Sequence, residues 1–539
     1  MFAKPAKNWL IPSWLLALLL SLPLLALIIS SLQPADETFQ HLLDTVLWDY
    51  VGNSLKLVSL TIVFALLFAL PAAWWVANCE FPGRRYFSWM LLLPLAMPGY
   101  VVAYIYTDFL DYAGPVQRAL RGVFGWTSPQ DYSFWEVRSI SGAALVLALG
   151  LFPYIYLIVR NTFAQQEAQL VNAARLLGAS PWQSFWRVAL PLARPAIVIG
   201  VSLVAMETLA DFAVAHYFAV STLTTAVYDT WLGLNSLEAA ARLSVFMLLG
   251  IMALVILERV SRRGQVQLAG KNAGSVLRLK MSIKGRVLAW LFCASLFVAG
   301  FLFPFVTLLD FAFSYFSEAW SEELFEYSWN SLTLSGSVAL ICLLMALLFT
   351  YNQRLHSSVW QQVPVKLSSS GYAIPGTVLA IGVLIALTAL DHGVNRWAQS
   401  FSLERPGLIF SGTVFAIGFA FIIRFMAIAN GAIEAGFSRL PESLDLSSRL
   451  LGQNAWQTFY RVHLPLLKMP MLTAALLVLI ECMKELPASL ILRPFNYDTL
   501  ATYVYQYVSD EQLELASLGA IFIVLMGLLP VMVMARNRS

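Results

Sequence analysis

The sequence predicts an all-α, polytopic membrane protein with about 12 transmembrane helices, arranged as two parallel six-helix repeats. Three observations lead to this fold class. Hydrophobic residues make up 59% of the 539 positions and charged residues only 12%, the mean hydropathy is +0.71, and the second half of the chain repeats the first. Because a soluble domain carries roughly a quarter charged residues, many of these apolar side chains must face the lipid bilayer.

Each apolar stretch approaches the twenty or so residues that a helix needs to cross about 30 Å of hydrocarbon. The expected spans are residues 10–32, 54–77, 88–110, 140–160, 195–218 and 243–260, then 286–312, 331–350, 370–390, 409–429, 471–492 and 515–535. The first span follows two lysines, as a signal peptide does, but its apolar run is too long and no small-residue cleavage site follows. We expect it to be retained.

The positions of Lys and Arg predict the orientation. Between the sixth and seventh spans, the segment from Arg259 to Arg286 is basic and has no acidic residue, so it is expected in the cytoplasm. The segments after the first and seventh spans are acidic and are expected outside. Both termini are then cytoplasmic. The expected organisation is a first repeat (1–260), a basic cytoplasmic linker (261–285) and a second repeat (286–539).

A shift of about 270 to 277 residues aligns the two halves. The matching segments are 53–55 with 330–332, 98–99 with 375–376, and, most closely, 175–192 with 449–466. Because each half has an even number of spans, both halves enter the membrane from the same side.

The closest match falls in a cytoplasmic loop of each half, between its fourth and fifth spans. In each copy a glycine is expected to end one helix, and a capping residue to start a short one with a glutamine that reaches back. These residues are Gly178, Ser180 and Gln183, then Gly452, Asn454 and Gln457. Aromatic residues follow at helical spacing: Trp182, Phe185 and Trp186, then Trp456, Phe459 and Tyr460. So short a helix needs a partner surface; the alternative is a helix that rests its aromatic rings among lipid headgroups.

This spacing resembles the marker of the inner-membrane permeases of binding-protein-dependent ABC importers: Glu-Ala-Ala, three residues, Gly, nine residues, Ile-x-Leu-Pro. The marker's glutamate is Asn172 in the first copy and Leu446 in the second. The resemblance implies a type I ABC importer permease fold, whose coupling helices sit in grooves of two ABC ATPase subunits. The residues implied are Asn172, Ala173, Ala174, Gly178, Trp182, Phe185, Arg187 and Pro191, then Gly452, Trp456, Phe459, Arg461 and Pro465.

The resemblance covers nearly the whole chain and is greatest to the fused, two-in-one permeases of ferric iron importers. It is carried by residues 209–212, 217–218 and 224–228 in the first half, and by 485–487, 492–496 and 498–501 in the second. It implies ferric iron as the solute, a periplasmic binding protein as a partner and the bacterial inner membrane as the location. Permeases for polyamine, sulfate or thiamine share the scaffold and stay open as alternatives.

Four carboxylates lie inside expected spans, at equivalent positions of the two halves. They are Glu207 with Asp211, and Glu481 with Glu485. A charge at mid-membrane costs roughly 2.5–3.5 kcal/mol on insertion scales, so we expect these groups to face protein or water. Our hypothesis is an acidic lining that favours a cation. The alternative is that they are buried interhelical partners or lie at the outer mouth, and Lys484 could neutralise the second pair.

Other classes of function find little support. No stretch forms a phosphate-binding loop, so the ATPase is expected to be a separate subunit. The four cysteines and five histidines are scattered, so we expect no cofactor, no firm metal site and no enzymatic centre. No strip combines basic and aromatic residues for nucleic acid. An ion-coupled secondary transporter that uses the intramembrane acids as proton sites is the rival class.

Overall fold

The computed structural model describes residues 10–34, 36–165, 176–178, 180–262, 279–355 and 359–536. Most of these residues are helical. The strands among them are β1 (Cys79–Glu80) and β2 (Leu279–Lys280), which pair in parallel with Cys79 opposite Leu279. This pairing fixes the C-terminal end of the basic linker, most of which lies outside the described residues.

The chain forms two compact units, each assembled from separate parts of the sequence. Unit 1 comprises Met1–Leu42, Ala226–Leu248 and Ser321–Tyr503, and unit 2 comprises Leu43–Thr225, Leu249–Trp320 and Val504–Ser539. The N-terminal helix therefore belongs with most of the second half. The units and the sequence repeats are different divisions of the chain, and the repeat boundaries at 1–260 and 286–539 stay a sequence-based proposal.

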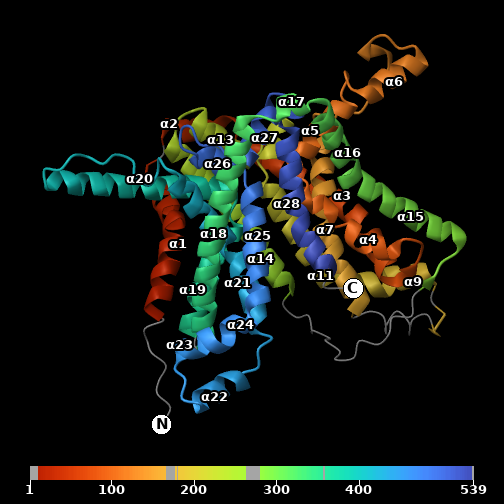
Figure 1. The fold of residues 1–539 in the computed structure, drawn as a ribbon. Helices are drawn as coiled ribbons and strands as arrows, with labels where there is room; N and C mark the ends of the chain where they lie inside the picture. Colours follow the sequence, from red (N-terminus) through yellow and green to blue (C-terminus); the bar gives the residue numbers. More distant parts are fainter. Residues whose placement is uncertain are drawn as a thin grey trace. The chain divides into compact units, whose positions relative to one another are not determined.

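Unit 2 is built around three long helices that pack against one another: α3 (Leu47–Asn78), α7 (Ile140–Gln165) and α11 (Arg194–Ala210) (Figure 1). Its other helices are α4 (Arg84–Met90), α5 (Gly99–Leu110), α6 (Pro115–Phe124), α9 (Pro181–Ser184), α10 (Leu190–Leu192), α12 (Ala213–Tyr217), α15 (Ile283–Phe297), α16 (Phe303–Ser314), α17 (Phe316–Ala319) and α28 (Ser517–Arg536). Large side chains such as Phe152, Tyr156 and Phe163 are fully buried in this core.

Unit 1 repeats the same three-helix core with α18 (Glu322–Leu355), α21 (Val414–Phe437) and α25 (Lys468–Lys484). Its other helices are α1 (Leu10–Ser31), α19 (Val359–Ser368), α20 (Gly376–Ser400), α22 (Ser443–Leu450), α23 (Ala455–Thr458), α24 (Leu464–Leu466) and α26 (Pro487–Leu492). Helix α1 packs along α19 and α20. The unit boundaries cut through four further helices: α2 (Glu37–Thr45), α13 (Leu223–Leu232), α14 (Leu237–Arg262) and α27 (Leu500–Ser509).

Short irregular turns join several of these helices. The 3₁₀ turns are Leu93–Ala96, Pro129–Asp131, Ser370–Ala373 and Leu513–Ala516, and the π-helical turns are Phe185–Ala189, Val298–Leu302 and Phe459–His463.

Within the described residues, eight helices are long and apolar enough to cross a membrane, or eleven if each of three bent pairs is one span. The bent pairs are Arg84–Ala96 with Gly99–Phe124 (93°), Phe185–Leu192 with Arg194–Ala210 (63°), and Ala455–Leu466 with Lys468–Lys484 (74°). The remaining expected span, 515–535, overlaps α28, where the apolar helix counted among the described side chains runs from Leu513 to Leu529. The all-α, polytopic architecture is therefore confirmed.

Proline accounts for the position of two of these bends. Pro98 takes an extended backbone (ψ 133°) immediately before α5. Ala193 leaves regular helical geometry (ψ −3°) before the Arg194-Pro195 start of α11. Met97, the residue before Pro98, is extended (ψ 128°), as the proline ring favours in its predecessor, and Pro195 in the first turn of α11 has no N–H with which to bond back across the bend.

Candidate functional site

Two short helical segments lie at equivalent places in the repeats, and we call them the loop helices. The first is Pro181–Leu192 in unit 2 and the second is Ala455–Leu466 in unit 1. Each consists of a four-residue α-helix, a five-residue π-helical turn and a final helical turn. Because the π-turn recurs at the same place, the repeat extends to local backbone geometry that the sequence alone did not reveal.

Both loop helices begin with the expected capping boxes. The backbone N–H of Ser180 donates to Gln183 Oε1 over 3.0 Å, and the N–H of Gln183 donates to Ser180 Oγ over 3.2 Å. In the second copy, the N–H of Asn454 donates to Gln457 Oε1 over 3.0 Å, and the N–H of Gln457 donates to Asn454 Oδ1 over 2.8 Å. Two N–H groups that a helix start leaves unpaired are thus satisfied reciprocally.

The two marker glycines also behave as expected. Gly178 and Gly452 have φ angles of +90° and +77°, in the left-handed region that glycine tolerates best. In the second copy, α22 ends at Leu450, and the N–H of Gly452 donates back to the Arg449 carbonyl over 3.0 Å. The helix expected before Gly178 includes Asn172, Ala173 and Ala174, which lie outside the described residues.

The aromatic residues of the loop helices divide into two groups. Phe185 is buried against Trp74, with 5.2 Å between ring centroids, and Phe459 packs on Tyr351 at 4.8 Å. By contrast, Trp456 is 58% exposed. The exposed group also contains Trp186 and Tyr460. Helical spacing placed these rings near one another, but only the structure separates the anchors of the loop from the exposed side chains.

The remaining predicted loop residues lie at the surface. Arg187 and Arg461 are exposed, Pro191 is half-buried and Pro465 is exposed. The backbone of Trp182 belongs to α9, while its side chain lies outside the description. Each loop helix therefore presents apolar and cationic groups outward on a segment that is anchored from behind.

A second repeated feature is a carboxylate at the end of each long core helix; we call these two positions the acidic breaks. Helix α11 ends at Ala210 and α25 ends at Lys484, and the next residues, Asp211 and Glu485, are extended. Asp211 Oδ1 accepts the N–H of Val214 over 2.8 Å, and Glu485 Oε1 accepts the N–H of Ala488 over 3.3 Å. Both carboxylates thus cap the short helix that follows.

The repeated Pro-Gly pairs abut these breaks. A Cβ atom built on Gly376 would lie 2.4 Å from Glu485 Oε1, and one built on Gly99 would lie 2.9 Å from Val214 Cγ2. Close approach of the backbone is a reason for glycine at both positions. The sequence match of residues 98–99 with 375–376 therefore marks the packing of each acidic break.

The two breaks differ in charge. Glu485 is 6% exposed and its Oε2 lies 3.0 Å from Arg424 Nε, while Arg424 Nη1 also donates to the Ile374 carbonyl over 3.2 Å. A shift of 274 residues, which places Phe163 on Phe437, puts Gly150 at the position of Arg424. The arginine was missed from sequence because its span was read only as apolar; a cation in mid-span is itself a signal of a buried partner.

The other two predicted carboxylates lie one helical turn earlier. Glu207 and Glu481 are both half-buried, and the carboxylate of Glu481 interacts electrostatically with the ammonium group of Lys484. The structure thus brings each predicted pair to the end of one helix, and the second member of each pair accepts a backbone N–H group.

Downstream of each break, the two repeats share one more turn. Ala219 and Asn496 both adopt left-handed backbone, with φ of +53° and +65°. Ser54 Oγ accepts the N–H of Leu223 over 2.9 Å, and Ser331 Oγ accepts that of Leu500 over 2.6 Å. These bonds give the serine of the repeated Asn-Ser pair a structural role. It accepts the first N–H group of α13 in one repeat and of α27 in the other.

In the second repeat, the Arg-Pro-Phe-Asn segment (residues 493–496) contains the left-handed residue of this turn, Asn496. Arg493 pairs with Asp498, and the side chain of Phe495 is 95% exposed.

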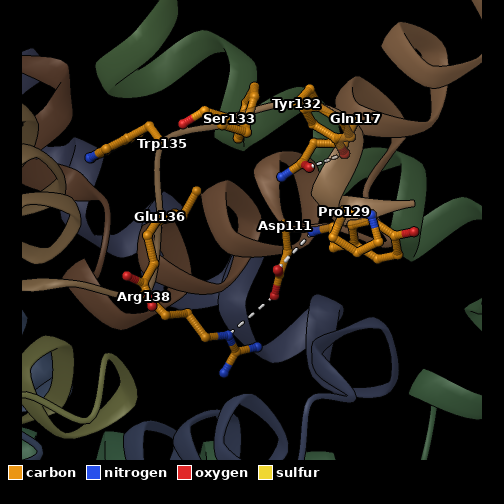
Figure 2. Close-up of a pocket in the computed structure, with 11 residues that line it drawn as sticks. Asp111, Gln117, Pro129, Tyr132, Ser133, Trp135, Glu136 and Arg138 are labelled. Atoms are coloured by element: carbon orange, nitrogen blue, oxygen red, sulfur yellow. Dashed lines mark hydrogen bonds and ion pairs between the residues drawn. The ribbon is translucent and has the colours of Figure 1, made fainter. Parts of the chain in front are cut away.

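The loop between α5 and α7 lines an open pocket of about 430 Å³ (Figure 2). At its edge Arg138 Nε lies 3.3 Å from Asp111 Oδ2, and the Tyr132 hydroxyl donates to Gln117 Oε1 over 2.6 Å. Arg138 also pairs with Glu511 at 2.5 Å. The charges of this loop are therefore partly engaged in ion pairs within unit 2.

The four cysteines are buried and unpaired with one another. In the part of the chain that the structure describes, no three His, Cys, Asp or Glu residues gather so that they could hold a metal ion.

The repeated architecture has a counterpart among known protein families. The family described as "Binding-protein-dependent transport system inner membrane component" matches twice, at residues 65–266 and 343–537. The chain belongs to this family. It is thus an inner-membrane permease component, and its type I permease fold contains two copies of the family unit.

Relatives of this permease transport different solutes by name. It is 24% identical to the Fe(3+)-transport system permease protein FbpB 2 of Haemophilus influenzae, over 90% of both chains. It is 31% identical to the molybdenum transport system permease protein ModB of Escherichia coli, over 40% of this chain and 93% of the relative. It is 28% identical to the sulfate transport system permease protein CysW of Synechocystis, over 46% of this chain and 92% of the relative.

These relatives differ in how much of the permease they cover. The ferric relative spans both repeats, whereas the molybdenum and sulfate relatives correspond to less than half of this chain. All are permease components of transport systems, not enzymes. The resemblance to fused two-repeat ferric permeases is therefore confirmed at the level of the whole chain.

Proposed function

We propose that this permease forms the translocation path for ferric iron in an ATP-driven importer, with a periplasmic binding protein that delivers the iron. The observation that carries the proposal is the match along 90% of both chains to a ferric transport permease with both repeats. Polyamine, sulfate and thiamine remain alternative solutes, and the molybdenum relative adds one more.

We further propose that the loop helices are the coupling helices of the permease, each in contact with one of two ABC ATPase subunits. Supporting features are the exposed Trp456 and Tyr460, the exposed Arg187 and Arg461, and the sharp bend that joins each loop helix to a core helix. An exposed aromatic side chain with an arginine on the same short segment suits a groove on a protein partner. When the ATPase dimer closes, each bend transmits the displacement of a loop helix to α11 or α25.

The orientation follows from the same proposal. The loop helices face the cytoplasm, as do both termini and the basic linker, while the segments before α3 and α18 face the periplasm.

We propose Glu207 and Glu481 as contacts of the passing cation. Both are half-buried near the ends of α11 and α25. Asp211 and Glu485, which accept backbone N–H groups at the acidic breaks, are proposed as the second contact of each pair.

The double variant Glu207→Gln, Glu481→Gln is expected to lower ferric uptake by at least about tenfold, because loss of ~1.4 kcal/mol of stabilisation corresponds to that factor. Uptake is measured with labelled ferric iron at matched membrane levels of the permease. The exposed pair Glu322→Gln, Glu323→Gln is the control and is expected to transport normally. Parental uptake by the Glu207, Glu481 variant would remove these residues from the path.

The solute is tested in cells that lack the gene and in cells with the gene restored. Uptake of labelled ferric iron, sulfate, molybdate, thiamine and polyamine is compared in both. We expect loss of iron uptake alone, with recovery on restoration. If iron uptake is unchanged and another solute fails, the iron proposal is wrong, while membership in the importer family stands.

A further inference from the structure

The second loop helix is joined to its unit by three side chains, which we call the charged tie: Arg354, Asp445 and His463. Arg354 is near the end of α18, Asp445 is in α22, and His463 ends the π-turn of the loop helix. Arg354 Nη2 lies 2.7 Å from Asp445 Oδ2, and His463 Nε2 lies 3.0 Å from Asp445 Oδ1. One aspartate thus links a core helix to the loop helix.

Arg354 extends the tie to a second core helix. Its Nη1 donates to the Phe437 carbonyl over 2.8 Å, and its Nη2 donates to the Leu440 carbonyl over 3.0 Å. Phe437 is the last residue of α21, where carbonyl groups lack partners within the helix and attract cations. The charged tie therefore connects α18, α21, α22 and the loop helix, and α22, α23 and α24 lie together at one end of unit 1 (Figure 1).

The surroundings favour strong interactions within the tie. His463 is fully buried and packs against the rings of Tyr351 and Phe437, each at 5.5 Å between centroids. Burial by itself would raise the pKa of Asp445, but the neighbouring His463 and Arg354 outweigh it and hold this pKa below its ordinary value. Asp445 therefore stays charged at neutral pH. The stability that its charge contributes is lost only as the pH falls through the lowered pKa.

The first loop helix has other residues at the three positions of the tie. At the positions equivalent to Arg354, Asp445 and His463 the sequence has Ala77, Val171 and Ala189, and Val171 lies outside the described residues. The rings that anchor this loop helix, Trp74, Phe163 and Phe185, match Tyr351, Phe437 and Phe459 in the second. The two loop helices thus share an aromatic anchor, and among the residues that the structure describes these charged contacts are seen at the second loop helix.

We propose that the charged tie makes the second loop helix move as one body with α18 and α21, so that the second ATPase contact transmits force to the membrane helices more directly than the first. Ion pairs and hydrogen bonds hold a narrow geometry, whereas apolar contacts are non-directional and allow sliding. Arg354, Asp445 and His463 are positioning residues for coupling. This inference rests on the proposed role of the loop helices.

The test replaces the tie with the residues of the first repeat, in the triple variant Arg354→Ala, Asp445→Val, His463→Ala. Removal of all members together leaves no unpaired buried charge, so folding is expected to persist. The variant is purified with its ATPase subunits and reconstituted in lipid vesicles with the binding protein. Three quantities are measured: ATPase co-purification, ATP hydrolysis, and solute transported per ATP hydrolysed.

We expect the ATPase subunits to bind and hydrolyse ATP normally, while transport per ATP falls at least about fivefold, the factor that corresponds to ~1 kcal/mol. His463→Gln, whose amide N–H donates to Asp445 in place of the ring, is the conservative control and is expected to keep most of the parental ratio.

Parental transport per ATP in the triple variant would overturn the proposal. Loss of ATPase binding in that variant would also overturn it, because the tie would then seat the ATPase rather than transmit its motion. A parental complex that binds no ATPase at all would instead refute the proposed function, so the two failures are distinguishable.

Discussion

The double variant Trp182→Glu, Trp456→Glu is expected to lose ATPase binding and to abolish ATP-driven uptake. Trp456 is 58% exposed on the second loop helix, and Trp182 is its sequence equivalent. A tryptophan at the centre of an interface contributes roughly 2 kcal/mol or more, and an unpaired carboxylate in an apolar groove adds a desolvation penalty. Binding is measured by co-purification of the ATPase subunits with the permease.

Two controls separate this effect from general damage. Trp456→Phe keeps an aromatic ring and is expected to retain most of the binding. Trp397→Glu changes a tryptophan of similar exposure (61%) at the far end of α20, and should leave ATPase binding unchanged. ATPase subunits that co-purify at the parental level with the double glutamate variant would contradict the assignment of the loop helices.

Replacement of Arg424 is expected to be the most destabilising single change in the acidic breaks. The variant Arg424→Met leaves Glu485, which is 6% exposed, without its cation. Removal of one partner of a buried ion pair costs roughly 3–5 kcal/mol, because the remaining charge is buried and uncompensated. We expect a clear fall in the thermal unfolding temperature of the permease in detergent and in its yield in the membrane.

The second member of the pair supplies the internal check. Arg424→Met, Glu485→Gln is expected to recover much of the lost stability, since the amide oxygen still accepts the N–H of Ala488. Arg439→Met removes an exposed arginine just beyond α21 and should be neutral. An Arg424→Met variant that unfolds at the parental temperature would show that the pair carries little stability.

Local pattern was enough to predict much of this fold. The spans follow from apolar length, and the capping boxes at Ser180 and Asn454 follow from residues only three positions apart. Gly178 and Gly452 were found as helix ends because a left-handed turn favours glycine. Such features depend on residues that are close to one another in the sequence, so the sequence alone predicts them.

The features that were missed depend on residues far apart in the sequence. Glu485 was expected as a lining carboxylate, but its pairing with Arg424, 61 positions away, depends on the packing of α21 on α25. His463 is one of five histidines that are scattered in the sequence, and only the fold brings it to Asp445. Likewise, helical spacing grouped Phe459 with Trp456 without showing that the first is an anchor and the second is exposed.

The assembly of the two units was also beyond local pattern. Nothing in the apolar stretch of α1 indicates that it packs along α19 and α20 of the second half. A lipid-facing helix carries a weak surface pattern, because lipid tails and helix interiors are similarly apolar.

The energy source of transport is tested with the purified permease and its ATPase subunits, in lipid vesicles with the iron-loaded binding protein. Accumulation of labelled ferric iron is followed with ATP, without ATP, and with an imposed proton gradient in place of ATP. We predict accumulation that requires both ATP and the binding protein. Accumulation driven by the proton gradient in vesicles without the ATPase subunits would contradict the account and favour an ion-coupled secondary transporter.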